Sequence, residues 1–92
     1  MTQAMGAATL WPNPVRDGQV NLNIDGLVDA EQNITVDIQD IYGKQVFAKE
    51  FGNSAERFNT ILNLSSEIAS GVYMVGITVN GERTVHRLSV SR

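Results

Sequence analysis

The sequence predicts an all-β fold, a seven-stranded immunoglobulin-like antiparallel β-sandwich. Short runs of alternating apolar and polar residues recur along the 92-residue chain at regular spacing, as expected for strands with one buried and one wet face. Turn signals rich in Asp, Asn and Gly separate these runs. A chain of this length is expected to form one small domain with a single hydrophobic core.

An edge strand and a cleanly alternating strand open the predicted domain. Residues 10–14 contain two prolines, which lack backbone donors, so this segment is expected to be an edge strand or an extended lead-in. Trp11 is expected to anchor it by covering one end of the core. After a turn at Asp17-Gly18, residues 19–24 alternate strictly and predict a half-buried strand.

A hairpin and a further strand follow. Residues 34–40 alternate again, and Asp40 and Gly43 stand at the first and fourth positions that a type I turn prefers. Residues 44–51 are therefore expected to complete a hairpin. Residues 57–64 then place apolar side chains on one face of another strand.

The segment 65–71 is the helical candidate of the sequence, and it is about one turn long. Ser65 is expected to cap this turn, and Gly71 is expected to end it in the left-handed conformation. Tyr73 follows at the start of the next strand. Its position predicts a tyrosine corner, in which the hydroxyl returns to the backbone just upstream.

Two strands joined by a tight turn complete the sequence. Residues 72–79 are the most apolar run and are expected to be central in their sheet. Asn80-Gly81 predicts a type I′ turn, because Asn tolerates and Gly readily adopts the positive φ that both central positions need. In the last strand Val85 has the opposite parity to the other apolar residues, and a β-bulge is expected to reconcile them.

The composition supplies few groups for catalysis or metal binding. There is no cysteine, and His86 is the single histidine, so neither a catalytic triad with a spare histidine nor a zinc site is expected. No cofactor and no enzyme activity are expected, and the net charge of −3 argues against a nucleic-acid partner. Asp25, Asp29 and Glu31 could offer oxygen ligands to Ca²⁺, although a carboxylate-rich loop is more often simply solvated.

The last strand is the most cationic part of this acidic chain. From Glu82 onward it carries Arg83, Arg87 and Arg92 against one acidic residue. Arginines on an edge strand can discourage edge-to-edge pairing of sheets. Alternatively, the exposed edge is recognised by another protein, for example by strand addition. The residues alone leave both interpretations open.

Five short motifs, in this order and spacing, resemble those of the type A C-terminal sorting domain of type IX secretion substrates. They are Leu10-Trp11-Pro12-Asn13-Pro14, Asp40-Ile41-Tyr42-Gly43-Lys44, Leu64-Ser65, Gly71-Val72-Tyr73 and the basic and apolar end from Arg87 to Arg92. The resemblance covers residues 10–92, and residues 1–9 are interpreted as a linker or an expression remnant.

The resemblance implies a non-catalytic secretion signal on a larger exported protein of a Gram-negative bacterium. Such a protein enters the periplasm by its own N-terminal signal, and the sorting domain then targets it to the type IX translocon. The implied partners are the translocon, its shuttle components and a surface sortase-like peptidase that cuts N-terminal to Leu10. The cargo, joined to anionic lipopolysaccharide, would then reside on the outer-membrane surface or outside the cell.

The resemblance also implies which residues the secretion machinery reads. Those that match the late motifs, and so are implied to contact the translocon or sortase, are Gly71, Tyr73, Gly81, Arg87, Leu88, Ser89, Val90, Ser91 and Arg92. The opening motif is matched by Pro12, Asn13 and Pro14, and the middle motif by Gly43 and Lys44.

Two other hypotheses stay open beside the secretion signal. The domain could be an immunoglobulin-like module of an extracellular protein that binds a glycan or a protein, with Trp11 or Phe47 in the site. It could also be a spacer without a partner of its own. The oligomeric state is open between a monomer and a dimer formed by edge pairing or strand exchange.

Overall fold

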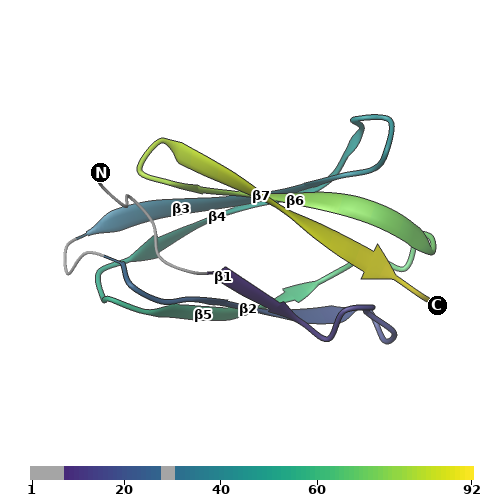
Figure 1. Cartoon of the computed structure of the whole chain (residues 1–92), viewed down its shortest axis with the longest axis horizontal. Coiled ribbons are helices and arrows are strands. Elements are labelled where there is room, and N and C mark those ends of the chain that lie inside the picture. The colour runs from purple at the N-terminus through teal and green to yellow at the C-terminus, as the bar shows by residue number, and fades with distance from the viewer. Residues whose placement is uncertain (1–7, 28–30) are drawn as a thin grey trace.

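The computed structural model describes residues 8–27 and 31–92, which form seven β-strands in two antiparallel sheets (Figure 1). The strands are β1 (Ala8–Trp11), β2 (Gln19–Ile24), β3 (Gln32–Gln39), β4 (Gln45–Asn53), β5 (Phe58–Asn63), β6 (Gly71–Val79) and β7 (Glu82–Val90). One sheet has the order β1-β2-β5 and the other β4-β3-β6-β7. The predicted immunoglobulin-like sandwich is confirmed.

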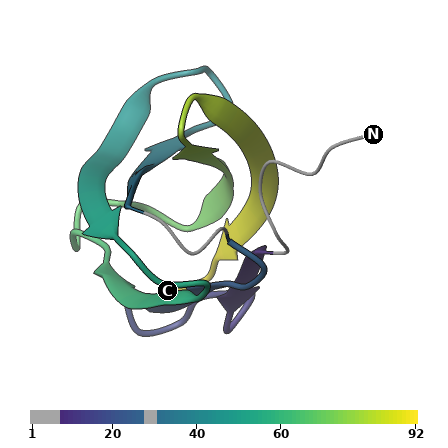
Figure 2. The same ribbon diagram turned by 90° about the vertical axis from the view of Figure 1, so that its left-hand side faces the viewer.

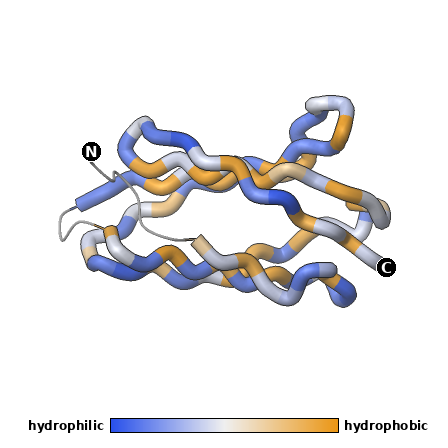
Figure 3. Tube along the Cα trace, viewed as in Figure 1, coloured by the Kyte–Doolittle hydropathy of each residue, from blue (hydrophilic) through white to orange (hydrophobic). Residues whose placement is uncertain are grey.

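The core lies between the two sheets, which curve around a common interior in the end-on view of Figure 2. Alternation along β2 and β3 sends every second side chain inward, and Leu22, Ile24, Ile34 and Val36 are fully buried. The hydropathy colouring of Figure 3 shows the same alternation along the strands. Burying each such side chain contributes about 1.5–3 kcal/mol, so the alternation itself is the main source of stability.

The two-residue turn between β6 and β7 is confirmed. Asn80 and Gly81 have φ angles of 50° and 89°, the left-handed values that a type I′ turn requires. The predicted β-bulge is wrong, because β6 and β7 pair without a register shift from Gly71↔Val90 to Val79↔Glu82. Val85 instead points outward and is 48% exposed, which a single apolar residue on a sheet surface tolerates.

The tyrosine corner is also confirmed, but the helical turn before it is not. The Tyr73 hydroxyl donates to the Ala69 carbonyl at 2.6 Å. The segment between β5 and β6 contains a β-turn and no helix, and in that turn the Ile68 N–H donates to the Ser65 carbonyl at 3.0 Å. A helix needs several turns to offset the cost of its nucleus, and here β6 begins at once with Gly71, outside the left-handed region.

Trp11 does not cover the core. Its neighbour Leu10 pairs with Leu22 and faces inward, so Trp11, opposite Asn21, must face the solvent, where it is 46% exposed. The buried residue that follows β1 is Val15. The prediction of an edge strand or extended lead-in over residues 10–14 is confirmed in part, because β1 pairs with β2 alone but ends at Trp11, and residues 12–14 are not in a strand.

Replacing Tyr73 with Phe is expected to lower the free energy of unfolding by about 1–2 kcal/mol, because the Ala69 carbonyl would lose its partner in a partly buried site. Thermal or urea unfolding measures the change. Tyr42→Phe is the matched control, since Tyr42 is 88% exposed on the β3–β4 turn. Equal stability of the two variants would contradict the role of the corner.

Candidate functional site

The outer edge of β7 is divided into two parts. β7 lies at the edge of its sheet, with β6 on one side. On the other side, the backbone beyond Arg87 meets residues 13–15, the segment between β1 and β2, which we call the strap. The earlier part, residues 82–86, is the open edge, because on that side no described strand pairs with it and no described backbone group bonds to it.

The strap binds β7 through the side chain of Asn13 and through the backbone of Val15. The Asn13 amide donates to the Arg87 carbonyl at 3.2 Å and accepts from the Ser89 N–H at 3.0 Å. Two residues further, the Val15 N–H donates to the Ser89 carbonyl and the Val15 carbonyl accepts from the Ser91 N–H, both at 2.8 Å. Asn13 thus takes the place of a peptide group in a short parallel pairing with the last strand.

The side chain of Val15 fastens the strap to the core. It is fully buried, and its backbone forms a parallel bridge with Val90. Pro12 and Pro14 flank Asn13, and neither needs a partner for a backbone N–H. Residues 12–15 therefore act together: Asn13 bonds to β7, the two prolines have no backbone N–H that needs a partner, and Val15 packs in the core.

Arg92 is held against the loop between β5 and β6. Its backbone N–H donates to the Ser70 hydroxyl at 2.8 Å, and its guanidinium donates to the Ser65 carbonyl at 3.0 Å. Gly18, with a φ of 82°, lies below the guanidinium, where an added Cβ would be 3.6 Å from Arg92 Nη2. The side chain of Arg92 thus has a structural role at this end of the sandwich.

Most of the sequence-predicted recognition residues come together at one end of the molecule. Gly71 and Tyr73 begin β6 beside the end of β7, and the strap lies on the other side of β7. Lys44 borders the same β5–β6 loop, since it lines a small pocket with Ser65. Gly81 is not part of this group, because the β6–β7 turn lies at the opposite end from the C-terminus (Figure 1).

Within the last strand, parity separates buried from accessible side chains. Leu88 and Val90 are buried in the core, whereas Arg87 is exposed and Ser89 is half-buried. Among the described residues Arg87 makes no ion pair. Within this part of β7, Arg87 is therefore an exposed cation whose side chain is accessible to a partner.

An ion pair that the sequence analysis missed braces the outer face. Arg83 lies across Gly76 of the central strand and donates to Asp37 on β3 at 2.7 Å. A Cβ at Gly76 would collide with the guanidinium of Arg83. A glycine inside the most apolar strand was the available signal, because such a glycine often marks a close approach by another group.

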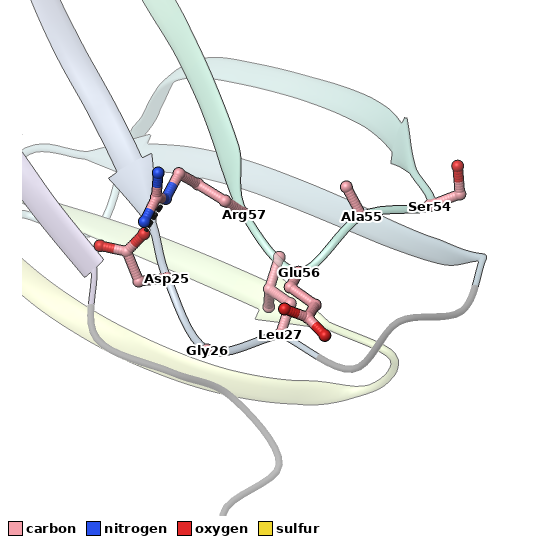
Figure 4. Close-up of a pocket in the computed structure, with 7 residues that line it drawn as sticks. All are labelled: Asp25, Gly26, Leu27, Ser54, Ala55, Glu56 and Arg57. Carbon is pink, nitrogen blue, oxygen red and sulfur yellow. Dashed lines mark hydrogen bonds and ion pairs between the residues drawn. The ribbon is translucent and has the colours of Figure 1, made fainter.

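The acidic loop does not form a cation site in the part of the chain that the structure describes. Asp25 pairs with Arg57 at 2.5 Å (Figure 4), and Asp29 lies outside the described residues. The bonds from Arg57 and Asn23 hold the pKa of the Asp25 carboxyl below its usual value. No cluster of three potential metal ligands occurs in residues 8–27 and 31–92.

His86 has a hydroxyl neighbour and no described acidic partner. The distance from His86 Nε2 to the Thr84 hydroxyl oxygen is 3.1 Å. A histidine that acts as a general base is normally oriented by a carboxylate or a comparable group.

Among the described segments, no helix is both long and apolar enough to cross a lipid bilayer.

Comparison with known proteins places the whole described domain in one family. The model of the family described as "Secretion system C-terminal sorting domain" matches residues 9–91. No curated protein matches the chain.

Two solved structures from Porphyromonas gingivalis are similar to the fold. Dimeric latent PorU is 25% identical with a TM-score of 0.74, and the match covers 90% of this chain and 9% of PorU. PorZ, described as an essential surface component of the type-IX secretion system, is 25% identical with a TM-score of 0.60, and the match covers 92% of this chain and 11% of PorZ. The chain thus spans about a tenth of the length of either protein.

Replacing Asn13 with Ala is expected to lower the free energy of unfolding by about 1 kcal/mol, because two hydrogen bonds to β7 are lost and water can replace them in part. Urea unfolding measures the change. Asn59→Ala is the matched control, because Asn59 is an exposed asparagine on β5 without a side-chain hydrogen bond to any described residue. A loss no larger than that of the control would contradict the strap.

Proposed function

Because this chain belongs to the family of secretion system C-terminal sorting domains, we propose that it directs a larger cargo protein through the type IX secretion system. The chain is a sorting signal. Its role implies export of that cargo to the outer membrane or the cell surface. The single observation that carries this conclusion is the family match across residues 9–91, which includes both the strap and β7.

The site fits a signal that a partner protein binds, and we propose no reaction for it. The described residues offer a hydrogen-bonded strand edge, an exposed cation and a loop bonded to Arg92, and His86 has no described carboxylate to orient it. We therefore assign the domain no catalytic step and no cofactor. A partner would recognise shape, backbone groups and charge.

The partners in this proposal are the translocon, its shuttle components and a surface sortase-like peptidase. The cargo would enter the periplasm first and would be joined to the sorting domain ahead of β1. The peptidase would then cut in the segment before β1, which leaves the strap and both sheets on the released domain. The similarity to PorU and PorZ, the second a surface component of the same secretion system, supports this assignment.

Arg87 is the residue of the last motif that we assign to direct contact with the machinery. It is exposed and makes no described ion pair, whereas Arg92 bonds to Ser65 and Ser70 and so has a structural role. Leu88 and Val90 would act through the fold, because both are buried. Gly81 would act through the turn, because its φ of 89° suits glycine.

A glycan-binding or protein-binding module is the second candidate, and one observation favours it. Trp11 and Ile61 are both exposed on the outer face of the three-stranded sheet, where they line a shallow groove with Asn21 and Asn59. An exposed indole beside side-chain amides can stack on a sugar ring and bond its hydroxyls. A glycan-array signal that Trp11→Ala abolishes would support this candidate.

The sorting role is tested with a secreted reporter fused ahead of residues 8–92 in a host that has a type IX system. The wild-type fusion is expected at the cell surface or in the medium. Arg87→Ala is expected to reduce export by roughly tenfold, because an interfacial charge that pairs with a partner contributes about 1–2 kcal/mol or more.

Arg16→Ala is the matched control, because Arg16 is also exposed, makes no described ion pair and lies outside the late motifs. Both variants are expected to unfold at the wild-type temperature. Normal export of the Arg87→Ala fusion would show that Arg87 is not needed for recognition. Retention of the wild-type fusion inside the cell would contradict the sorting role itself.

A further inference from the structure

The open edge of β7 offers backbone groups in the arrangement of an unfinished sheet. The strap bonds to residues 87, 89 and 91, so the odd-numbered residues of β7 direct their N–H and C=O groups away from β6. By the same alternation, the N–H and C=O groups of Arg83 and Val85 point away from β6, in the plane of the sheet. Within the described residues these groups have no partner. Such an edge is a template for another strand.

The outward side chains beside this edge give it a charge pattern. Arg83, Val85 and Arg87 alternate on the outer face, so a half-exposed apolar residue lies between two cations. Asp37 neutralises Arg83 in part, and its own side chain is only 15% exposed. Arg87 makes no ion pair with any described residue.

We propose that the open edge of β7 is the docking site for an extended segment of a partner protein in which acidic residues flank an apolar one. The segment pairs with the backbone of Arg83 and Val85, places its apolar side chain beside Val85, and sets its carboxylates toward Arg83 and Arg87. This inference rests on the proposed function, since the partner is a component of the secretion machinery.

The strap limits how far this pairing extends. It makes four hydrogen bonds to the edge beyond the open part, through Asn13 and Val15. A partner strand that continues toward Ser91 would make bonds of the same kind, so exchanging the strap for the partner changes the number of hydrogen bonds little. In the absence of a partner the strap covers this later part of the edge and limits its pairing with other sheets.

A second copy of this chain fits the open edge less well. Pairing two such edges would bring Arg83 and Arg87 of both copies to one outer face, and like charges across strands are unfavourable. An acidic strand satisfies those cations. Charge complementarity therefore favours a partner of different sequence over self-association.

The direct test uses a synthetic peptide, Thr-Glu-Thr-Val-Thr-Glu-Thr, added to the complete 92-residue chain labelled with ¹⁵N. The amide signals of Arg83 and Val85 are expected to shift first, with weak affinity. The same peptide with Lys for Glu is expected to bind at least roughly tenfold more weakly, because its charges repel the arginines. Equal binding of both peptides, or no binding of the first, would overturn the proposal.

Two variants locate the site. Val85→Pro removes an outward N–H without removing a bond to β6, and an edge strand tolerates proline. It is expected to weaken binding of the acidic peptide by roughly tenfold or more while the melting temperature stays within a few degrees. If Val85→Pro unfolds the chain, Asn13→Ala provides the test instead. Loosening the strap is expected to make this variant bind the acidic peptide severalfold more tightly than Asn59→Ala does.

Failure of this inference can be told from failure of the sorting role. If the Val85→Pro reporter fusion is exported as well as the wild type, the open edge is not the docking site, and the domain is still a sorting signal. If the acidic peptide binds but the wild-type fusion is never exported, the edge binds strands and the sorting role fails. Unchanged peptide binding in both Val85→Pro and Asn13→Ala would refute the edge as the site.

Discussion

The pairing of the strap with the end of β7 is the contact on which this end of the domain depends. The strap follows β1 of one sheet and bonds to β7 of the other, so it joins the two layers through Asn13 and Val15. The Arg92 side chain secures the same end from the opposite direction by its bond to Ser65. The first motif of the sequence and the last are therefore in direct contact in the folded domain.

The alternation of β7 lets one strand serve both the core and a partner. Leu88 and Val90 face inward and are buried, so their loss would damage the fold whatever their role in recognition. Val85 and Arg87 face outward and can change with little effect on the core, whereas Arg83 also holds Asp37. Deleting the strand confounds these two roles, whereas substituting outward residues separates them.

Sequence patterns captured what depends on neighbours along the chain. Strict alternation, the Asn80-Gly81 turn and the tyrosine corner of Tyr73 are local, and the structure confirms them. The strap was beyond reach because Asn13 bonds to residues 74 and 76 positions away through its side chain. The prediction for Trp11 was wrong because a single aromatic residue does not indicate which face of its strand is buried. The register of β1 with β2 decides that.

The central claim is that the edge of β7 is open in its first part and covered by the strap in its second. Residue-resolved amide hydrogen exchange of the free chain tests it most directly. The account predicts fast exchange at Arg83 and Val85 and at least roughly tenfold slower exchange at Ser89 and Ser91, whose N–H groups bond to Asn13 and Val15. Equal protection at all four amides, or the reverse order, would contradict it.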